Sequence, residues 1–239
     1  MISFIVPAFN EERLLGRTLE AIHAAARELG ERSEVIVVDD GSADRTAAIA
    51  GACGARVVGV RFRHIARARN AGAQAARGDT LIFVDADTIV SAATVRATVE
   101  ALRRGAAGGG ATVEFDGRLP PYARLLLPVF RVVMRAGRLA AGCYVFCSRA
   151  AFEAAGGFDE RLYAAEEIAF SRTLGQHGAF VILRESVTTS GRKLRTFSGW
   201  EILRLCATLV RRRTALVRSR DGLALWYGDR RDDSDGRSA

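Results

Sequence analysis

The first hundred residues alternate short apolar runs with segments of helical spacing, and this alternation limits the fold more than any other feature. The apolar runs predict strands over residues 2–6, 34–38, 55–60 and 80–84. Helical patterns separate and follow them over residues 11–29, 44–53, 64–77 and 91–104. Strands that are apolar throughout are buried on both faces, as in a parallel sheet covered by helices. We therefore predict an α/β fold with a mostly parallel sheet flanked by helices.

The pattern changes after residue 105. A glycine cluster at 108–110 is expected to be flexible, and a strand is predicted over 111–115. Residues 117–140 read as an insertion with an amphipathic helix, and 140–149 are compatible with another strand. The regular alternation therefore ends near residue 104.

Acidic residues follow two of the predicted strands. Asp39 and Asp40 come after the run at 34–38, and Asp85 and Asp87 come after LIFV at 81–84. Ligands of parallel sheets bind outside the carboxyl ends of the strands. Neighbouring carboxylates repel one another, and hard oxygen ligands of this kind suit Mg²⁺ or Mn²⁺. The pair Asp85 and Asp87 is therefore a candidate metal site.

Each acidic pair also has a purely structural interpretation. Ser42 and Asp44 would cap the helix that follows Asp39 and Asp40, and Asp85 with Asp87 would cap a turn. A third pair, residues 166–167, opens a predicted helix, where acids favour the helix dipole.

Five segments in this order resemble the family 2 glycosyltransferases, which have the GT-A fold of the nucleotide-diphospho-sugar transferases. They are IVPAFNEE (5–12), VIVVDDGSADRT (35–46), ARARNAGAQAARGD (66–79), LIFVDADT (81–88) and GGFDERLYAAEEIAFSRTL (156–174). The resemblance covers about residues 1–185. It implies a metal-dependent, inverting transfer of a sugar from a nucleotide diphosphate, most often UDP in this family.

The resemblance also implies nucleotide-binding residues. Asp40 would accept the imide N–H of a uracil-like base, with Asp39 beside it. Arg69 and Asn70 would lie near the nucleotide and its phosphates. The pocket after the first strand would be lined by Pro7, Ala8, Phe9 and Glu11.

Metal binding and catalysis would fall to the two later acidic motifs. Asp87 would be the direct ligand of Mn²⁺ or Mg²⁺, and Asp85 would lie near the metal and the ribose or sugar. Glu167 stands where the family usually has a catalytic Asp, so we expect it to be the general base, with Glu166 as the rival candidate. This departure keeps an alternative open, a catalytically inactive nucleotide- or glycan-binding protein on the same fold.

These expectations divide the chain into a nucleotide-binding half (1–104), an acceptor and catalytic half (105–185), a basic loop with an amphipathic C-terminal helix (186–228) and a disordered tail (229–239). In the loop, Arg192, Lys193 and Arg195 would close over the diphosphate, bind an anionic acceptor or simply be solvated.

The net charge of +8 has several explanations. No nucleic-acid-binding motif accompanies the arginines, so we expect no nucleic-acid partner. An apolar stripe in the C-terminal helix (Ile202, Leu205, Leu209 and Val210) precedes Arg211–Arg213. This pattern fits either an anionic membrane surface or a helix docked on the core. In the first case the acceptor would be lipid-linked, and Phe130, Val133 and Met134 would add to the lipid-facing surface.

The four cysteines (Cys53, Cys143, Cys147 and Cys206) lack the spacing of a zinc site. The N-terminus has no basic region of the kind that opens a signal peptide, and no apolar stretch is long enough to span a bilayer. We expect a cytoplasmic protein, peripheral to the inner face of the membrane if the membrane interpretation holds.

Overall fold

One eight-stranded sheet runs through the computed structural model, which describes residues 1–196 and 201. Its order is β3-β2-β1-β4-β7-β6-β8-β5. The strands are β1 (Ile2–Ala8), β2 (Ser33–Asp39), β3 (Arg56–Gly59), β4 (Thr80–Val84), β5 (Thr88–Ile89), β6 (Ala106–Phe115), β7 (Tyr144–Ser148) and β8 (Ala179–Thr189). Strands β3, β2, β1 and β4 are parallel, as are β6 and β8, whereas β7 is antiparallel to both of its neighbours and β5 to β8.

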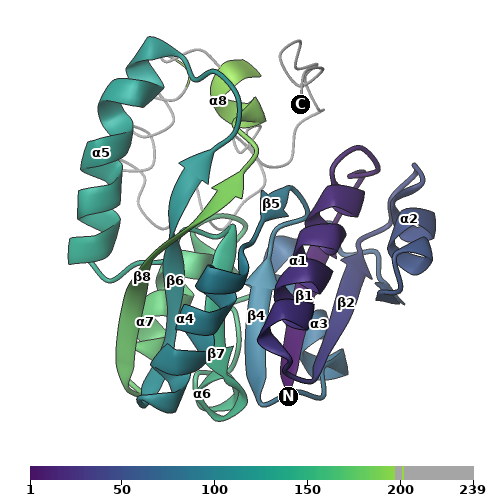
Figure 1. The fold of residues 1–239 in the computed structure, drawn as a ribbon, viewed down its shortest axis with the longest axis horizontal. Coiled ribbons are helices and arrows are strands. Elements are labelled where there is room, and N and C mark those ends of the chain that lie inside the picture. The colour runs from purple at the N-terminus through teal and green to yellow at the C-terminus, as the bar shows by residue number, and fades with distance from the viewer. Residues whose placement is uncertain (197–200, 202–239) are drawn as a thin grey trace.

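Helices cover both faces of this sheet (Figure 1). They are α1 (Leu15–Leu29), α2 (Thr46–Ala52), α3 (Ile65–Ala75), α4 (Ala92–Arg103), α5 (Pro121–Ala136), α6 (Arg149–Ala154), α7 (Glu166–Leu174) and α8 (Arg192–Thr196). Residues of α1, α2 and α4 form one apolar core with the sheet, and residues of α3, α6 and α7 form the other. The predicted α/β fold with a mostly parallel sheet is confirmed.

The expectation of a flexible glycine cluster is wrong. Gly108, Gly109 and Gly110 lie inside β6 and are buried. A Cβ atom on Gly109 would clash with the carbonyl of Val181 and the ring of Phe146. These glycines are therefore required by close packing between β6 and its neighbours rather than by chain flexibility.

Two segment boundaries expected from the sequence also differ from those in the structure. Strand β8 continues through residue 189, so a division at 185 falls inside a strand. Arg192, Lys193 and Arg195 lie in the short helix α8 rather than in a loop. The stripe at Ile202, Leu205, Leu209 and Val210, together with Arg211–Arg213, Cys206 and the tail at 229–239, falls outside the described residues.

Candidate active site

The candidate site lies where β1 and β4 end side by side. These two strands are parallel neighbours. The chain leaves β1 into the loop that holds Glu11, and it leaves β4 into the loop that holds Asp85 and Asp87. In an open sheet, this carboxyl edge is where the connections on either side diverge and leave a crevice for a ligand.

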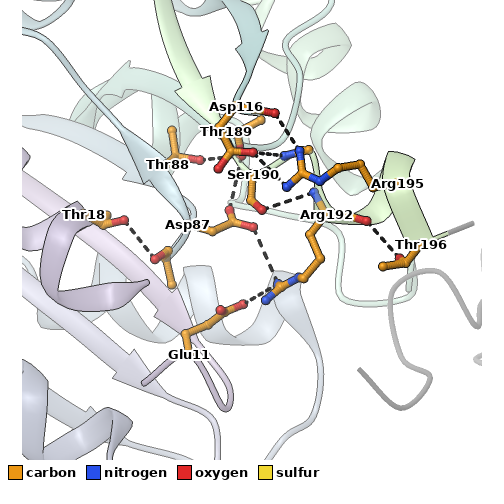
Figure 2. Close-up of polar contacts among 12 residues, drawn as sticks. Glu11, Thr18, Asp87, Thr88, Asp116, Thr189, Ser190, Arg192, Arg195 and Thr196 are labelled. Atoms are coloured by element: carbon orange, nitrogen blue, oxygen red, sulfur yellow. Dashed lines mark hydrogen bonds and ion pairs between the residues drawn. The ribbon is translucent and has the colours of Figure 1, made fainter. Parts of the chain in front are cut away.

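Glu11 and Asp87 share one cation, Arg192 of α8 (Figure 2). One guanidinium nitrogen of Arg192 lies 3.3 Å from a carboxylate oxygen of Glu11 and 3.8 Å from one of Asp87. The hydroxyl of Thr189, at the end of β8, donates to the other oxygen of Asp87 across 3.2 Å. Burial and the negative charges of Glu11 and Asp85 raise the pKa of Asp87 to about 6. A cation bound here would reduce the repulsion between the carboxylates of Glu11, Asp85 and Asp87.

The donor set fits a hard divalent cation in complex with a nucleotide. No group of three His, Cys, Asp or Glu side chains among the described residues is arranged to enclose a metal by itself. Mg²⁺ and Mn²⁺ in nucleotide enzymes need only one or two carboxylates, because phosphates and waters complete the coordination. Asp85 and Asp87 supply that number, and crowding raises the pKa of Asp87.

Arg69, which was predicted to lie near the nucleotide and its phosphates, is enclosed by the protein. Its side chain is only 2% exposed. It donates to Asp85 at 3.0 Å, to Glu166 at 2.6 Å and to the carbonyl of Gly142 at 2.8 Å. These contacts hold Asp85 and Glu166 in position, and the place of Arg69 near the nucleotide and its phosphates stays a prediction.

Asn70 and Asp40 also face inward. The amide of Asn70 both donates to and accepts from the backbone of Phe158, each at 2.9 Å. Asp40 is 5% exposed, and its carboxylate accepts backbone N–H groups of residues 62, 63 and 64. Hydrogen bonds within the protein engage both side chains. The contacts of Asn70 with phosphates and of Asp40 with a nucleobase stay predictions. Asp39, half-buried at the end of β2, accepts one N–H from Ser42 at 3.3 Å.

The loop after β1 is fastened to the loop after β2. The backbone N–H of Asn10 donates to Ser42 at 2.9 Å, and that of Glu11 donates to Thr46 at 2.8 Å. Pro7 and Ala8 are buried within β1. Ser42 thus fixes one loop against the other, and the carboxyl end of β1 is a rigid wall of the site.

Phe9 and Arg63 form a feature that the motifs did not indicate. The guanidinium of Arg63 lies 3.4 Å from the centroid of the Phe9 ring. Arg63 has a positive φ of 51°, in the segment whose N–H groups Asp40 accepts. These two contacts place a cationic, planar group at the end of β1.

Glu166 and Glu167 differ sharply although they are adjacent at the start of α7. Glu166 is buried and paired with Arg69. Glu167 is half-buried, and a Cβ on Gly142 would come 3.5 Å from its carboxyl carbon. Burial, with the neighbouring charge of Glu166, raises the pKa of Glu167 well above the ordinary glutamate value. A carboxylate with a raised pKa is suited to accept a proton near neutral pH.

Comparison with known proteins places these features in context. The family model described as glycosyl transferase family 2 matches residues 3–153. An undecaprenyl-phosphate 4-deoxy-4-formamido-L-arabinose transferase of Pseudomonas aeruginosa is 38% identical over 99 residues, which cover 36% of this chain and 28% of that protein. The glycosyltransferase EpsJ of Bacillus subtilis is 35% identical over 105 residues, covering 42% and 30%. The matched region thus spans less than a third of either relative.

Solved structures share the fold along most of the chain. The mannosyltransferase PcManGT of Pyrobaculum calidifontis, in complex with GDP-Man and Mn²⁺, has a TM-score of 0.69 at 20% identity. That match covers 97% of this chain and 65% of PcManGT. Residues 1–349 of TarS from Staphylococcus aureus have a TM-score of 0.64 at 20% identity, covering 87% of this chain and 65% of the TarS chain.

Proposed function

The chain belongs to glycosyltransferase family 2, and on that basis we propose that it transfers a sugar from a UDP-linked donor to an acceptor hydroxyl with inversion at the anomeric carbon. The observation that carries the proposal is the bridge formed by Arg69. One buried guanidinium binds Asp85, of the acidic loop after β4, and Glu166, the neighbour of Glu167. The residues proposed for the donor and for the general base are thereby fixed relative to each other.

On the donor side, Asp85 and Asp87 would hold Mn²⁺ or Mg²⁺. The bound ion would neutralise negative charge on the departing diphosphate. We assign the nucleobase N–H to Asp39, because Asp40 already accepts three backbone N–H groups. Phe9, at the end of β1, offers an aromatic surface beside it.

On the acceptor side, Glu167 takes the proton of the attacking hydroxyl. The acceptor oxygen forms a bond to the anomeric carbon, the bond from that carbon to the diphosphate oxygen breaks, and the hydroxyl proton goes to the Glu167 carboxylate. The pKa of Glu167 is raised by its surroundings, which increases its proton affinity at the moment of transfer. Glu166 has the positioning role, because its carboxylate is engaged by Arg69.

We further propose that the acceptor is lipid-linked. The support is the name of the curated relatives that match about a third of this chain, which are undecaprenyl-phosphate sugar transferases. The lipid would bring the acceptor to the active site from the surface of a membrane.

Calorimetric titration tests the donor site first. UDP, GDP, dTDP and CDP are titrated into the full chain with Mn²⁺ and again with EDTA. We expect UDP to bind only when Mn²⁺ is present. We expect Asp87→Asn to abolish this Mn²⁺-dependent binding. Metal-independent binding, or a preference for another nucleotide, would contradict the assignment. Metal-dependent binding of UDP without any turnover of UDP-sugars would instead indicate a catalytically inactive binding protein.

A further inference from the structure

The outward face of α5 is apolar. Six of its large side chains are exposed, with exposed fractions from 42% for Phe130 to 76% for Leu125; they are Leu125, Leu126, Val129, Phe130, Val132 and Val133. On this helix, burial is confined to the small side chain of Ala123. Figure 1 shows α5 at the margin of the molecule, beside the long strands β6 and β8. An amphipathic helix docked on a protein core normally turns its apolar side inward, so this arrangement is reversed.

Polar contacts hold the inner side of α5. The hydroxyl of Tyr122 donates to the carbonyl of Leu194 at 2.7 Å. Arg131 donates to the carbonyl of Val113, and Arg135 to the carbonyl of Leu183, each at 3.0 Å. A cavity of about 230 Å³ lies between the helix and the sheet, with Phe130, Met134 and Ile182 among its lining residues. The helix is thus attached by hydrogen bonds while most of its apolar area faces away from the protein.

The spacing of these residues separates apolar from basic surface. Leu125, Val129 and Val132 follow one another at intervals of four and three, so they share one side of the helix. Arg124, Arg131 and Arg135 follow at intervals of seven and four and form a separate row. A helix with an apolar stripe bordered by arginines is typical of segments that lie in the plane of a membrane surface.

No carboxylate neutralises this region from within its own segment. Residues 117–138 contain no Asp or Glu and five arginines: Arg118, Arg124, Arg131, Arg135 and Arg138. Within the described part of the chain, Arg124, Arg131 and Arg135 form no ion pair, and the groups that accept from Arg131 and Arg135 are uncharged. The surface therefore presents apolar area together with uncompensated positive charge.

We propose that α5 docks the protein on an anionic lipid surface. The apolar face of Leu125, Leu126, Val129, Phe130, Val132 and Val133 would enter the boundary between headgroups and acyl chains. The exposed Arg118 and Arg124 would contact lipid phosphates, because a basic residue near an anionic bilayer is attracted to its surface potential. None of the described helices is long and apolar enough to cross a bilayer. The inference does not depend on the proposed donor or acceptor.

Charge favours lipid over other partners for this face. A second copy would bring the same arginines together and add repulsion rather than complementarity. Residues 197–228 of this chain carry six arginines and two acids, and residues 229–239 carry three arginines beside four aspartates, so neither segment offers a strong opposite charge. An anionic bilayer satisfies both the apolar stripe and the charges of the exposed Arg118 and Arg124.

Vesicle sedimentation tests the proposal with the full-length chain. Vesicles of phosphatidylcholine alone are compared with vesicles containing phosphatidylglycerol, in the absence of any sugar nucleotide. The unchanged protein is expected to bind the anionic vesicles at least tenfold more tightly than the neutral ones. The double substitution Leu125→Gln with Val132→Gln is expected to weaken that binding at least tenfold, whereas Val57→Gln, at an apolar side chain that is 37% exposed on β3, leaves it unchanged.

A second pair of variants separates charge from apolar insertion. Arg118→Gln with Arg124→Gln should reduce binding to the anionic vesicles and leave the weak binding to neutral vesicles as it was. Arg32→Gln, an exposed arginine before β2, is the matched control. If the substitutions in and beside α5 leave vesicle binding unaltered, the lipid-docking surface lies elsewhere and the inference is overturned.

The other possible occupants of this face give distinct results. Should the α5 substitutions instead convert a dimer to a monomer in light scattering, the face is an interface between two copies and the lipid proposal fails. The titration of UDP with Mn²⁺ is repeated on every variant. Unchanged UDP binding with lost vesicle binding supports the inference, and its outcome is therefore separable from that of the proposed function.

Discussion

Arg69 and Glu166 lie 2.6 Å apart in the protein interior, and their contact joins α3 to the start of α7. The same guanidinium binds Asp85 at 3.0 Å. Two acids that come from distant parts of the sequence are thus held by one cation that is almost inaccessible to water. Removing the cation would leave buried charge without a partner, which is the costly way to break such a pair.

Replacing Arg69 with methionine should therefore destabilise the fold. We expect the free energy of unfolding to fall by about 3–5 kcal/mol, the scale observed when one partner of a buried ion pair is removed. Urea denaturation followed by circular dichroism measures the change. Arg32→Met, at an exposed arginine, is the control and should shift the midpoint little. An unchanged midpoint for Arg69→Met would mean that the bridge does not contribute to stability.

Glu167→Gln should separate binding from catalysis. The substitution keeps the size of the side chain but removes its ability to accept a proton. We expect transfer to an acceptor hydroxyl to fall about 10²-fold or more, the scale of a lost general base. Mn²⁺-dependent binding of UDP should persist, as measured by calorimetry. The comparison variant is Glu166→Gln, which should mainly lower stability because it weakens the bridge to Arg69.

The same substitution also distinguishes two classes of acceptor. A hydroxyl needs a base, whereas the oxygen of a lipid phosphate is already ionised at neutral pH. If the transfer rate of Glu167→Gln stays within a few-fold of that of the unchanged enzyme, Glu167 is not the general base. That result would favour a phosphate acceptor. A slow Glu166→Gln variant with normal stability would assign the base to the neighbouring residue.

The pH dependence of kcat/KM should report the raised pKa of Glu167. The general base must be ionised to accept a proton, so activity rises with pH until the pH exceeds the pKa of Glu167. Burial and the charge of Glu166 raise that pKa. The acidic limb should therefore lie above the pH at which an ordinary glutamate ionises, and Glu167→Gln should remove it. A limb that coincides with ordinary glutamate ionisation would show that this carboxyl does not act as the base.

The first part of the fold could be predicted because apolar runs and helical spacing are local signals. Strands β1, β2, β3 and β4 all lie within the predicted runs or within two residues of them. The second part depends on which strands pair, and periodicity does not carry that information. Gly109 illustrates the point: a glycine cluster looks flexible in sequence, yet packing against Val181 and Phe146 requires the missing side chain.

Only part of the candidate site could likewise be predicted from the sequence. The sequence placed Asp85 and Asp87 at the carboxyl edge of the sheet, but a motif does not state the direction of each side chain. Arg69 and Asp40 point into the protein and are engaged there. These hydrogen bonds depend on contacts with segments that are distant along the chain, which a motif does not specify.

The contact of Arg192 with Glu11 and Asp87 leads to the last prediction. Its guanidinium lies 3.3 Å from Glu11 and 3.8 Å from Asp87, where positive charge is needed when no metal is bound. Arg192→Gln should tighten binding of Mn²⁺ alone about three- to tenfold, because a competing cation is removed. It should weaken Mn²⁺-dependent binding of UDP, because a donor for the diphosphate is lost. Titration of Mn²⁺, followed by the electron paramagnetic resonance signal of the free ion, measures the affinity for the metal alone. Calorimetric titration of UDP in the presence of Mn²⁺ measures the second effect. Arg32→Gln, at an exposed arginine before β2, should change neither; equal effects of the two substitutions would reduce the role of Arg192 to general positive charge.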